Sequence, residues 1–473
     1  MDSQKKVYLK TFGCQMNEHD SQAMLNMLKR QGYQTVSKAE DADLILYNTC
    51  TIREKAYHKA MSDLGRAKEH KKLRDDVQIG ITGCAAQQGK EDIARRFKHV
   101  DFILGPDQLL QLPSLAGREK SQKAYVATEL INDSKNYEFL DVVPDHDVEG
   151  STAFVSIMKG CNCKCSYCIV PAVRGREVYR TGKEVVDDIK RLVDRGVKEV
   201  MLLGQNVASY RDPLYGDAAI APIAGTGNQP RSLAALIRLI ADNTNIERIR
   251  FTSPHPRDIE DTLIEAYRDV EKLCGQIHLP AQSGSNAMLK RMRRGYTREH
   301  YLNIVEKVRA ARPGIAISTD LIVGFCGETD EEFQDSLSLL REVQYDALFA
   351  FSYSERPGTY ATSSLQDDVP EKVKKARLKE LLQLDQVISF EKNKQLVGKV
   401  VSTLVTGFDK HGHGKLQGRA DDNRLIHFQG DRSLIGSIVP VMLTEARGNS
   451  LEGELLFNDH SREYHHIRVN SCN

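Results

Sequence analysis

The stretch Gly160-Cys161-Asn162-Cys163-Lys164-Cys165-Ser166-Tyr167-Cys168 concentrates four thiols in one short loop. It follows an apolar run over residues 153–158 that predicts a strand. Packing alone gives no reason to place cysteines so densely, so they are metal ligands, catalysts or disulfide partners. The subset Cys161-x3-Cys165-x2-Cys168 can supply three thiolates to a four-iron cluster and leave one iron open for a small molecule. Alternatively, all four thiols could form a zinc knuckle that also uses Cys163.

The composition limits the class of protein. A chain of 473 residues is long enough for about two to four domains, and a net charge of +1 gives no global signal for binding polyanions. No apolar run is long enough to span a bilayer, and the N-terminal residues lack the apolar core of a signal peptide. Ten cysteines in a reducing compartment favour metal or redox chemistry over disulfides. We therefore expect a cytoplasmic protein with no membrane partner.

The N-terminal third alternates strand-like and helix-like segments, which predicts a parallel α/β sheet. The carboxyl ends of such strands share one edge of the sheet, where ligands bind. A cysteine follows each predicted strand, so we expect three cysteines to meet at that edge, although each taken singly is more often a buried apolar residue. The strands cover residues 6–12, 44–47 and 77–81, and the cysteines are Cys14, Cys50 and Cys84.

The middle of the chain predicts a second α/β region. A polar segment over residues 132–150 predicts a linker, and residues 212–230 predict a loop insertion rich in Gly and Pro. About six β/α units predict a parallel α/β region with its chemistry at the carboxyl ends of the strands. The expected strands are 153–158, 200–203, 246–251, 276–279, 315–322 and 347–353, and the expected helices include 184–193, 232–242, 258–267 and 298–311.

The C-terminal part predicts a long helix followed by a small antiparallel β-barrel. The helix covers residues 370–395, and the short β-type runs cover 400–405, 425–428, 437–443 and 451–456. The expected organisation is an N-terminal α/β domain over 1–131, the linker over 132–150, a barrel with its connecting helix over 151–395 and the β-barrel over 396–473.

The cysteine loop resembles a known family. The pattern Cys-x3-Cys-x-aromatic-Cys, with Tyr167 as the aromatic residue, resembles the signature of the radical S-adenosylmethionine (SAM) superfamily. The resemblance implies a partial (β/α)6 barrel in which Cys161, Cys165 and Cys168 hold a [4Fe–4S] cluster and SAM binds its open iron. We interpret His255 and His278 as structural histidines. The residues implied to contact SAM are Tyr167, Gly204, Gln205, Asn206, Ser253, Gln282, Ser283, Asp320 and Phe325.

The other cysteines carry a second resemblance, to the methylthiotransferases. It rests on Thr11-Phe12-Gly13-Cys14-Gln15-Met16-Asn17, on Asn48-Thr49-Cys50-Thr51-Ile52-Arg53-Glu54-Lys55-Ala56 and on Gly83-Cys84-Ala85-Ala86-Gln87. These segments are most similar to the branch of the family that acts on tRNA. They imply a second, auxiliary [4Fe–4S] cluster on Cys14, Cys50 and Cys84, and the C-terminal module resembles a TRAM domain, which binds RNA.

Together the resemblances imply an enzyme, a radical-SAM tRNA methylthiotransferase. It would convert N6-isopentenyladenosine next to the anticodon into its 2-methylthio derivative, with one SAM as methyl donor and one as radical source. The implied partners are the tRNA anticodon stem-loop, a low-potential electron donor similar to flavodoxin or ferredoxin, and a sulfur donor, and the protein would be a monomer. The candidate substrate or RNA contacts are Asn17, Arg53, Arg293, Arg294, Arg356, Lys415, Arg419 and Arg424.

Two alternatives stay open. The same chemistry could act on threonylcarbamoyl adenosine in tRNA or on an aspartate of a ribosomal protein. A protein of another class, which binds RNA through zinc or an iron–sulfur cluster without catalysis, would also use dense cysteines and a small β-barrel.

Overall fold

The computed structural model describes residues 4–51, 54–118, 123–133, 135–143, 151–213, 232–409 and 414–456. The chain divides into two compact units, Met1–Ser389 and Phe390–Asn473, and each is described by itself. Within the described residues, no helix has the length and apolar content needed to cross a membrane. Arg53, most of the predicted loop insertion at 212–230 and the end of the predicted linker lie outside the described residues.

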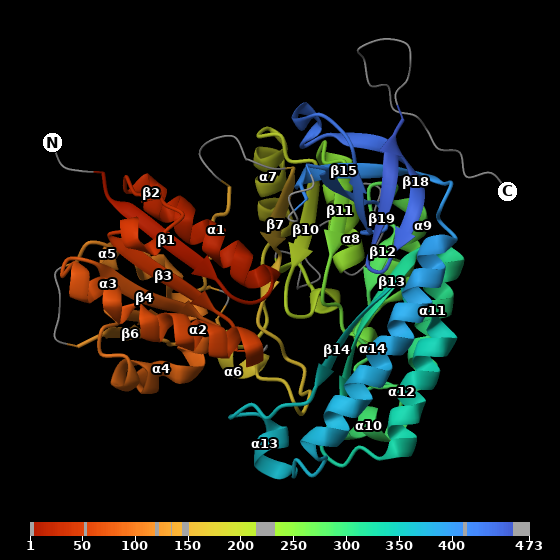
Figure 1. Cartoon of the computed structure of the whole chain (residues 1–473), viewed down its shortest axis with the longest axis horizontal. Coiled ribbons are helices and arrows are strands. Elements are labelled where there is room, and N and C mark those ends of the chain that lie inside the picture. The colour runs from red at the N-terminus through yellow and green to blue at the C-terminus, as the bar shows by residue number, and fades with distance from the viewer. Residues whose placement is uncertain are drawn as a thin grey trace. The chain divides into compact units, whose positions relative to one another are not determined.

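The first unit begins with a six-stranded, wholly parallel sheet in the order β2-β1-β3-β4-β5-β6. Alternate residues of its strands enter two separate apolar cores, one with α1 and α5 and the other with α2 and α4, so helices cover both faces (Figure 1). The strands are β1 (Lys6–Thr11), β2 (Gln34–Thr35), β3 (Leu44–Thr49), β4 (Gln78–Gly83), β5 (Phe102–Leu104) and β6 (Tyr125–Ala127). The helices are α1 (Gln15–Arg30), α2 (Glu54–Arg66), α3 (Lys68–Leu73), α4 (Cys84–Arg96) and α5 (Leu112–Leu115).

Part of the predicted linker packs against the regions on either side of it. Leu140 and Val142 lie in the N-terminal core, and Val143 lies in the core of the region that follows. Asn132 accepts a hydrogen bond from the backbone of Arg176, at the end of the cysteine loop. These few apolar side chains therefore fasten a segment whose overall polarity predicted a free connection.

The second α/β region contains six parallel strands arranged as two three-stranded sheets, β11-β10-β7 and β12-β13-β14, around a common apolar core. The strands are β7 (Thr152–Ser156), β10 (Glu199–Leu203), β11 (Arg248–Phe251), β12 (Gln276–His278), β13 (Ala316–Val323) and β14 (Ala347–Ser352). The larger helices are α7 (Gly182–Val193), α8 (Leu233–Asn243), α9 (Asp261–Asp269), α11 (Arg298–Ala311), α12 (Asp330–Val343) and α14 (Glu371–Lys394). Short elements complete it: β8 (Met158–Lys159), α6 (Val170–Arg174), β9 (Val178–Tyr179), α10 (Asn286–Arg291) and α13 (Tyr360–Ser364).

The second unit contains a closed five-stranded barrel in the order β15-β16-β17-β19-β18 around its own core. Four of its pairings are antiparallel as predicted, but β17 and β19 are parallel, because the chain crosses the barrel between them instead of turning back in a hairpin. The strands are β15 (Val400–Phe408), β16 (Leu416–Ala420), β17 (Leu425–Phe428), β18 (Ile438–Arg447) and β19 (Ser450–Leu455).

A buried acid in α14 generates a pH-dependent prediction. Asp385 is buried, and Leu381 and Ile388 lie on the same face of the helix. Burial raises the pKa of Asp385 from 3.8 to about 6. In the unfolded chain the Asp385 carboxyl ionises at the ordinary pKa of 3.8, whereas in the fold it ionises at about 6. Its contribution to stability therefore falls as pH rises from about 4 to about 6 and stays low above that range.

We expect Asp385→Asn to raise the free energy of unfolding by about 1–3 kcal/mol at pH 7.5, and by less at pH 5. Thermal melting of the full chain at both pH values measures the difference. Glu380→Gln, on the exposed side of the same helix, is the control and should change little. An equal effect of Asp385→Asn at both pH values would contradict this origin of the instability.

Candidate functional site

The cysteine loop is held between two short paired strands, β8 and β9. Gly160 has a φ of +75°, and a Cβ atom there would lie 2.0 Å from the carbonyl oxygen of Arg176, so only glycine allows the loop to close. Ser166 anchors the centre of the loop, because its hydroxyl donates to Arg291 O at 3.0 Å and its carbonyl accepts from Ala361 N at 2.7 Å. The loop is therefore fixed by segments that follow it far along the chain.

The thiols of this loop lie close enough to influence one another's ionisation. Burial raises the pKa of Cys168 to about 12, and a hydrogen bond with the Cys163 thiol together with burial raises that of Cys161. The same hydrogen bond lowers the pKa of Cys163, with help from Arg257. Among the described residues, no three His, Cys, Asp or Glu side chains are arranged to hold a single metal ion. Binding of a metal cluster deprotonates its thiol ligands and offsets such unfavourable burial.

Two side chains face Cys165, the guanidinium of Arg294 and the imidazole ring of His255. Arg294 Nη1 donates to Cys165 Sγ and to the Tyr167 hydroxyl, both at 3.3 Å, and Nη2 donates to Pro280 O at 3.0 Å. His255 Nε2 lies 3.8 Å from Cys165 Sγ, and burial and the Arg294 charge lower its pKa to about 3, so the ring is neutral. Arg294, predicted as an RNA contact, is 5% exposed and is engaged by these protein groups. Its sequence signal, one arginine within a basic run, did not distinguish it from its exposed neighbours.

Four predicted SAM contacts follow the carboxyl ends of barrel strands: Gly204 and Gln205 come after β10, Ser253 after β11 and Gln282 after β12. A Cβ atom on Gly204 would lie 2.4 Å from Met158 Cγ, so the strand end has no space for a side chain there. Gln205 Oε1 is buried and has no hydrogen-bond partner among the described residues, which leaves a polar atom for a ligand to satisfy. Ser253 and Gln282 hold left-handed backbone conformations, with φ of +61° and +70°. Non-glycine residues at such angles concentrate at binding sites.

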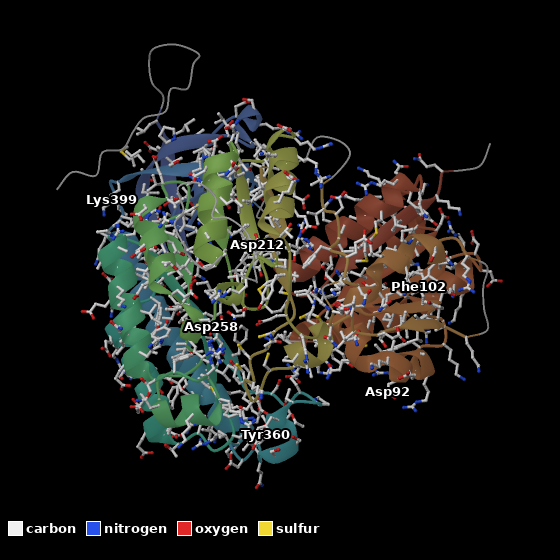
Figure 2. The ribbon with its side chains drawn as sticks, turned by 180° about the vertical axis from the view of Figure 1, so that it is seen from behind. Asp92, Phe102, Asp212, Asp258, Tyr360 and Lys399 are labelled. Atoms are coloured by element: carbon white, nitrogen blue, oxygen red, sulfur yellow. The ribbon has the colours of Figure 1, made fainter. Side chains whose placement is uncertain are left out.

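Three predicted SAM contacts instead support their neighbours. Asn206 is 1% exposed; its side chain donates to Asp258 at 2.7 Å and accepts from the backbone of His255 (Asp258 is labelled in Figure 2). Ser283 is 1% exposed and its hydroxyl accepts from Ser285 N. Phe325 is completely buried and packs edge-on against the Tyr167 ring. All three side chains are thus held by protein neighbours in the fold.

Asp320 and His278, which face each other across neighbouring strands, show a different arrangement. His278 Nε2 lies 3.5 Å from Asp320 Oδ2, and its Nδ1 lies 3.0 Å from the Ser318 hydroxyl. Both are partly exposed, and Phe349 beside His278 is exposed as well. His278 is thus partnered by protein groups, as interpreted, while Asp320 keeps an accessible surface.

The second set of cysteines lies at the carboxyl ends of neighbouring parallel strands. Cys14 follows β1 and precedes α1, Cys50 follows β3, and Cys84 begins α4 directly after β4. Gly13, with φ of +135°, allows the first two segments to approach, because a Cβ atom there would lie 2.5 Å from Cys50 Cβ. Burial raises the pKa of Cys84 to about 12; the Cys50 and Cys14 thiols also raise it, against the Arg174 charge. Their positions after neighbouring parallel strands thus bring the three cysteines close enough to share one electrostatic environment.

Asn17 supports this second set from inside the fold. It is completely buried, and its side chain donates to Asn48 Oδ1 at 3.0 Å and to Thr49 O at 3.1 Å. Cys14 Sγ donates to Asn17 Oδ1 at 3.4 Å. Asn17, predicted as an RNA contact, thus positions the Cys14 and Cys50 segments through these hydrogen bonds.

Arg174, which the sequence did not single out, connects the two sets. Its Nε donates to Cys84 Sγ at 3.3 Å, and its Nη2 donates to Asp20 Oδ2 at 2.7 Å. Burial would raise the pKa of Asp20, but the charge of Arg174 and a hydrogen bond from His19 outweigh it, so the pKa lies below 3.8. Arg174 ends α6, which begins two residues after Cys168, and α6 packs against Cys84. One buried guanidinium thus connects Cys84 and α1 with the short helix that follows the cysteine loop.

The remaining candidate RNA contacts differ in accessibility. The exposed Arg293 stacks on Tyr360, with 3.4 Å between its guanidinium carbon and the ring centroid (Tyr360 is labelled in Figure 2). In the second unit, Arg419 is exposed, Lys415 is ion-paired with Glu452 at 2.6 Å and Arg424 donates to Asn393 at 2.9 Å. Exposure therefore favours Arg293 and Arg419, whose side chains are more accessible than those of Lys415 and Arg424.

The fold and the site define the class of protein. A partial six-stranded parallel barrel with three cysteines in the loop after its first strand is typical of radical-SAM proteins, and the Radical SAM superfamily matches residues 155–340. The Uncharacterized protein family UPF0004 matches residues 6–105, and the TRAM domain matches residues 394–456. The solved structure of the radical SAM methyltransferase TsrM from Kitasatospora setae has a TM-score of 0.53 at 13% identity, covering 85% of this chain and 81% of its own, and so shares the fold.

Full-length relatives then give the family. The tRNA-2-methylthio-N(6)-dimethylallyladenosine synthase of Alkalilimnicola ehrlichii is 44% identical over 452 residues, which cover 95% of this chain and 97% of that protein. The protein of the same name from Geobacter sulfurreducens is 44% identical over 458 residues, covering 96% and 98%. The chain belongs to the family of tRNA-2-methylthio-N(6)-dimethylallyladenosine synthases. These matches confirm the predicted family and fold class.

Arg174 generates a stability prediction. We expect Arg174→Met to lower the free energy of unfolding by about 3–5 kcal/mol, because it leaves the Asp20 carboxylate buried without its partner. The double variant Arg174→Met/Asp20→Leu should recover a large part of the loss. Thermal melting of the four proteins in this cycle gives the coupling, and additive losses would contradict it.

Neighbouring arginines provide a second test. Arg294→Met should lower the free energy of unfolding by about 2–4 kcal/mol, because it removes buried charge-assisted hydrogen bonds to Pro280 and Cys165. Arg293→Met, the matched control one residue away, removes an exposed stacking contact and should cost about 1 kcal/mol or less. Equal losses in thermal melting would show that burial does not distinguish the two side chains.

Proposed function

We propose that this chain is a tRNA methylthiotransferase that converts N6-isopentenyladenosine next to the anticodon into its 2-methylthio derivative. One SAM serves as methyl donor and another as radical source. The observation that carries the proposal is the contact of Arg174, in the helix that follows the cysteine loop, with Cys84 of the second set, since methylthio transfer needs both a radical and a sulfur carrier. Near-full-length relatives at 44% identity carry the corresponding name.

The cysteine loop is the proposed site of the first cluster. As a radical-SAM protein the chain uses a [4Fe–4S] cluster and SAM, and we assign the cluster to Cys161, Cys165 and Cys168. When bound, this pair supplies one-electron chemistry that can remove a hydrogen atom from an unreactive C–H bond. Arg294 and His255 orient Cys165, and Arg294 offsets its thiolate charge. The residues proposed to line the SAM site are Tyr167, Gly204, Gln205, Ser253, Gln282 and Asp320.

The N-terminal set is the proposed site of an auxiliary [4Fe–4S] cluster that carries sulfur. Cys14, Cys50 and Cys84 are three thiols of suitable type at one sheet edge. Arg174 donates to one of them, and such a charge-assisted hydrogen bond stabilises a thiolate. Asn17 holds the first two segments at their separation.

The proposal includes the partners of the reaction. The substrate is the anticodon stem-loop of tRNA, with Arg293, Arg356 and Arg419 as accessible candidate contacts and Lys415 as a partnered one. An anticodon-loop base is already single-stranded, so it reaches a buried site at low energetic cost. A low-potential electron donor and a sulfur donor supply electrons and sulfur, and we propose a cytoplasmic monomer. In the predicted organisation, the N-terminal domain holds the auxiliary cluster, the barrel holds the first cluster and SAM, and the TRAM-like domain binds RNA.

Metal content and nucleoside analysis test the proposal. Anaerobically reconstituted protein should contain about eight iron and eight sulfide per chain, and Cys14→Ala/Cys50→Ala/Cys84→Ala should keep about four of each. That variant should still cleave SAM under dithionite but should not form 2-methylthio-N6-isopentenyladenosine in tRNA, as measured by mass spectrometry. Cys274→Ala, at a buried cysteine outside both sets, is the control and should keep all the iron.

Three outcomes would contradict parts of the proposal. Zinc without sulfide in the wild type would favour the non-catalytic alternative. A methylthio group on threonylcarbamoyl adenosine or on a ribosomal protein would assign a different substrate. Methylthiolated tRNA from the triple variant would exclude the auxiliary cluster as the sulfur carrier.

A further inference from the structure

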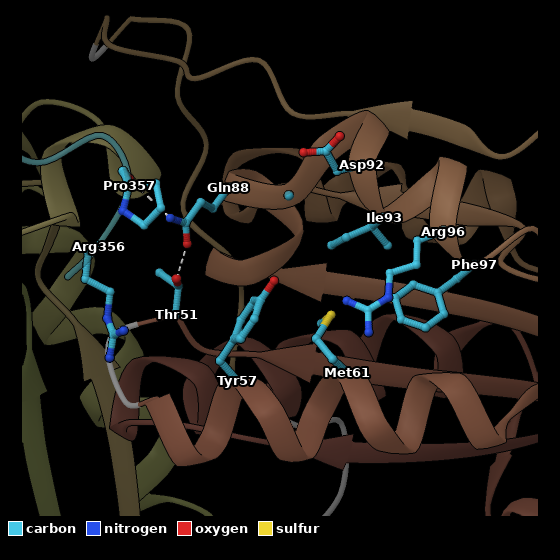
Figure 3. A pocket seen from close by; sticks show the side chains of 11 residues that line it. Thr51, Tyr57, Met61, Gln88, Asp92, Ile93, Arg96, Phe97, Arg356 and Pro357 are labelled. Atoms are coloured by element: carbon cyan, nitrogen blue, oxygen red, sulfur yellow. Dashed lines mark hydrogen bonds between the residues drawn. The ribbon is translucent and has the colours of Figure 1, made fainter. Parts of the chain in front are cut away.

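A groove of about 290 Å³ lies beside the N-terminal cysteines and has no role in the chemistry above (Figure 3). Three segments line it: Thr51 with α2, α4 with the residue after it, and the loop after β14. Its volume is at the lower end of the range for small-molecule sites. The side chains used below are Thr51, Tyr57, Met61, Arg96, Phe97 and Arg356.

The lining combines an apolar floor with cationic rims. Met61 and Phe97 are buried, and Tyr57 is half-buried with its ring toward the groove (Figure 3). Arg96 is exposed, its guanidinium carbon lies 4.9 Å from the centroid of the Phe97 ring, and Arg356 lines the groove from the loop after β14. This composition suits a planar group that carries a negative charge beside it.

The carboxylate of Asp92 in the groove lining does not neutralise the positive charge of the two arginines. It is ion-paired with Arg95 on the next turn of α4. Among the described residues, Arg96 has no carboxylate partner. A single-stranded nucleotide matches both features, because bases stack on aromatic rings and arginine planes while phosphates pair with arginine.

The groove is built on the segments that carry the cysteines. Thr51 directly follows Cys50, and Gln88 lies one turn after Cys84 on α4. Gln88 hydrogen-bonds to the Thr51 hydroxyl and donates to Pro357 O at 3.2 Å, which joins the three lining segments (Figure 3). Next to it, α4 is interrupted at Lys90, with φ of +32°, so the helix changes direction along the groove. An RNA strand that presents one base to the cysteines therefore has this groove as a neighbouring site.

We propose that this groove binds a nucleotide of the tRNA anticodon loop that neighbours the modified adenosine. Its base stacks on Tyr57 above Met61 and Phe97, and Arg96 and Arg356 bind its phosphate. The inference rests on the proposed function, because it names how the substrate of that reaction is held. It adds a binding site for a base that is not chemically changed.

A fluorescent stem-loop tests the groove. Anticodon stem-loops that carry 2-aminopurine at one loop position at a time are titrated with the full, anaerobically prepared chain. One position beside the target should lose fluorescence on binding, because stacking on an aromatic ring quenches 2-aminopurine. Tyr57→Ala should abolish that change and weaken binding about 5- to 150-fold, whereas Tyr57→Phe should keep both.

Charge-matched variants test the phosphate contact. Arg96→Ala should weaken binding and reduce its salt dependence, because one phosphate contact is lost. Lys98→Ala removes the same charge two residues away, outside the lining, and should bind as the wild type does. Thermal melting checks that each variant is folded, and the half-exposed position of Tyr57 makes its truncation tolerable.

The outcomes separate the inference from the proposed function. Wild-type binding with no position-specific quenching, or unchanged binding by Tyr57→Ala and Arg96→Ala, would overturn the groove and leave the methylthiotransferase proposal intact. No binding of the stem-loop by the wild type would overturn both. Equal losses in Arg96→Ala and Lys98→Ala would assign the effect to general surface charge.

Discussion

The buried ion pair between Arg174 and Asp20 is the interaction on which the two cysteine sets depend for their arrangement. Asp20 belongs to α1 of the N-terminal sheet, and Arg174 ends the short helix that follows the cysteine loop. Separating the two would leave each charge buried without its ionic partner, which costs far more than the loss of an exposed pair. Segments more than one hundred residues apart are therefore held together by one guanidinium.

The same physical device occurs at both sets of cysteines. Arg174 donates to Cys84 Sγ and Arg294 donates to Cys165 Sγ, each at 3.3 Å, and both arginines are buried. A buried thiolate is costly unless a positive group or a hydrogen bond offsets its charge. Each arginine also bonds to a second protein group, Asp20 or Pro280, so its own position is fixed. The fold thus places one fixed positive charge beside each predicted cluster site.

Much of the architecture could be predicted because long apolar runs carry a clear period. Five of the six barrel strands and the three strands before Cys14, Cys50 and Cys84 follow from such runs, whereas the three-residue β12 was placed by the alternation of strands and helices. The short strands β2, β5 and β6 were missed, because two or three residues carry too little periodic signal. β16 was missed as well, because Gly418 interrupts its apolar pattern. A Cβ atom on Gly418 would lie 2.7 Å from the carbonyl oxygen of Leu404, so the neighbouring strand leaves no space for a side chain there. The parallel pairing of β17 with β19 depends on barrel closure, which no local pattern records.

By itself, the sequence determined the cysteine spacing of the loop and the position of a cysteine at the end of three strands, because both are local properties of a short segment. Only the tertiary structure decided which polar residues face those thiols and which face solvent. Arg293 and Arg294 are adjacent and chemically identical, yet one lies on the surface against Tyr360 and the other lies inside against Cys165. Burial is set by the packing of segments distant in sequence, so composition alone could not separate them.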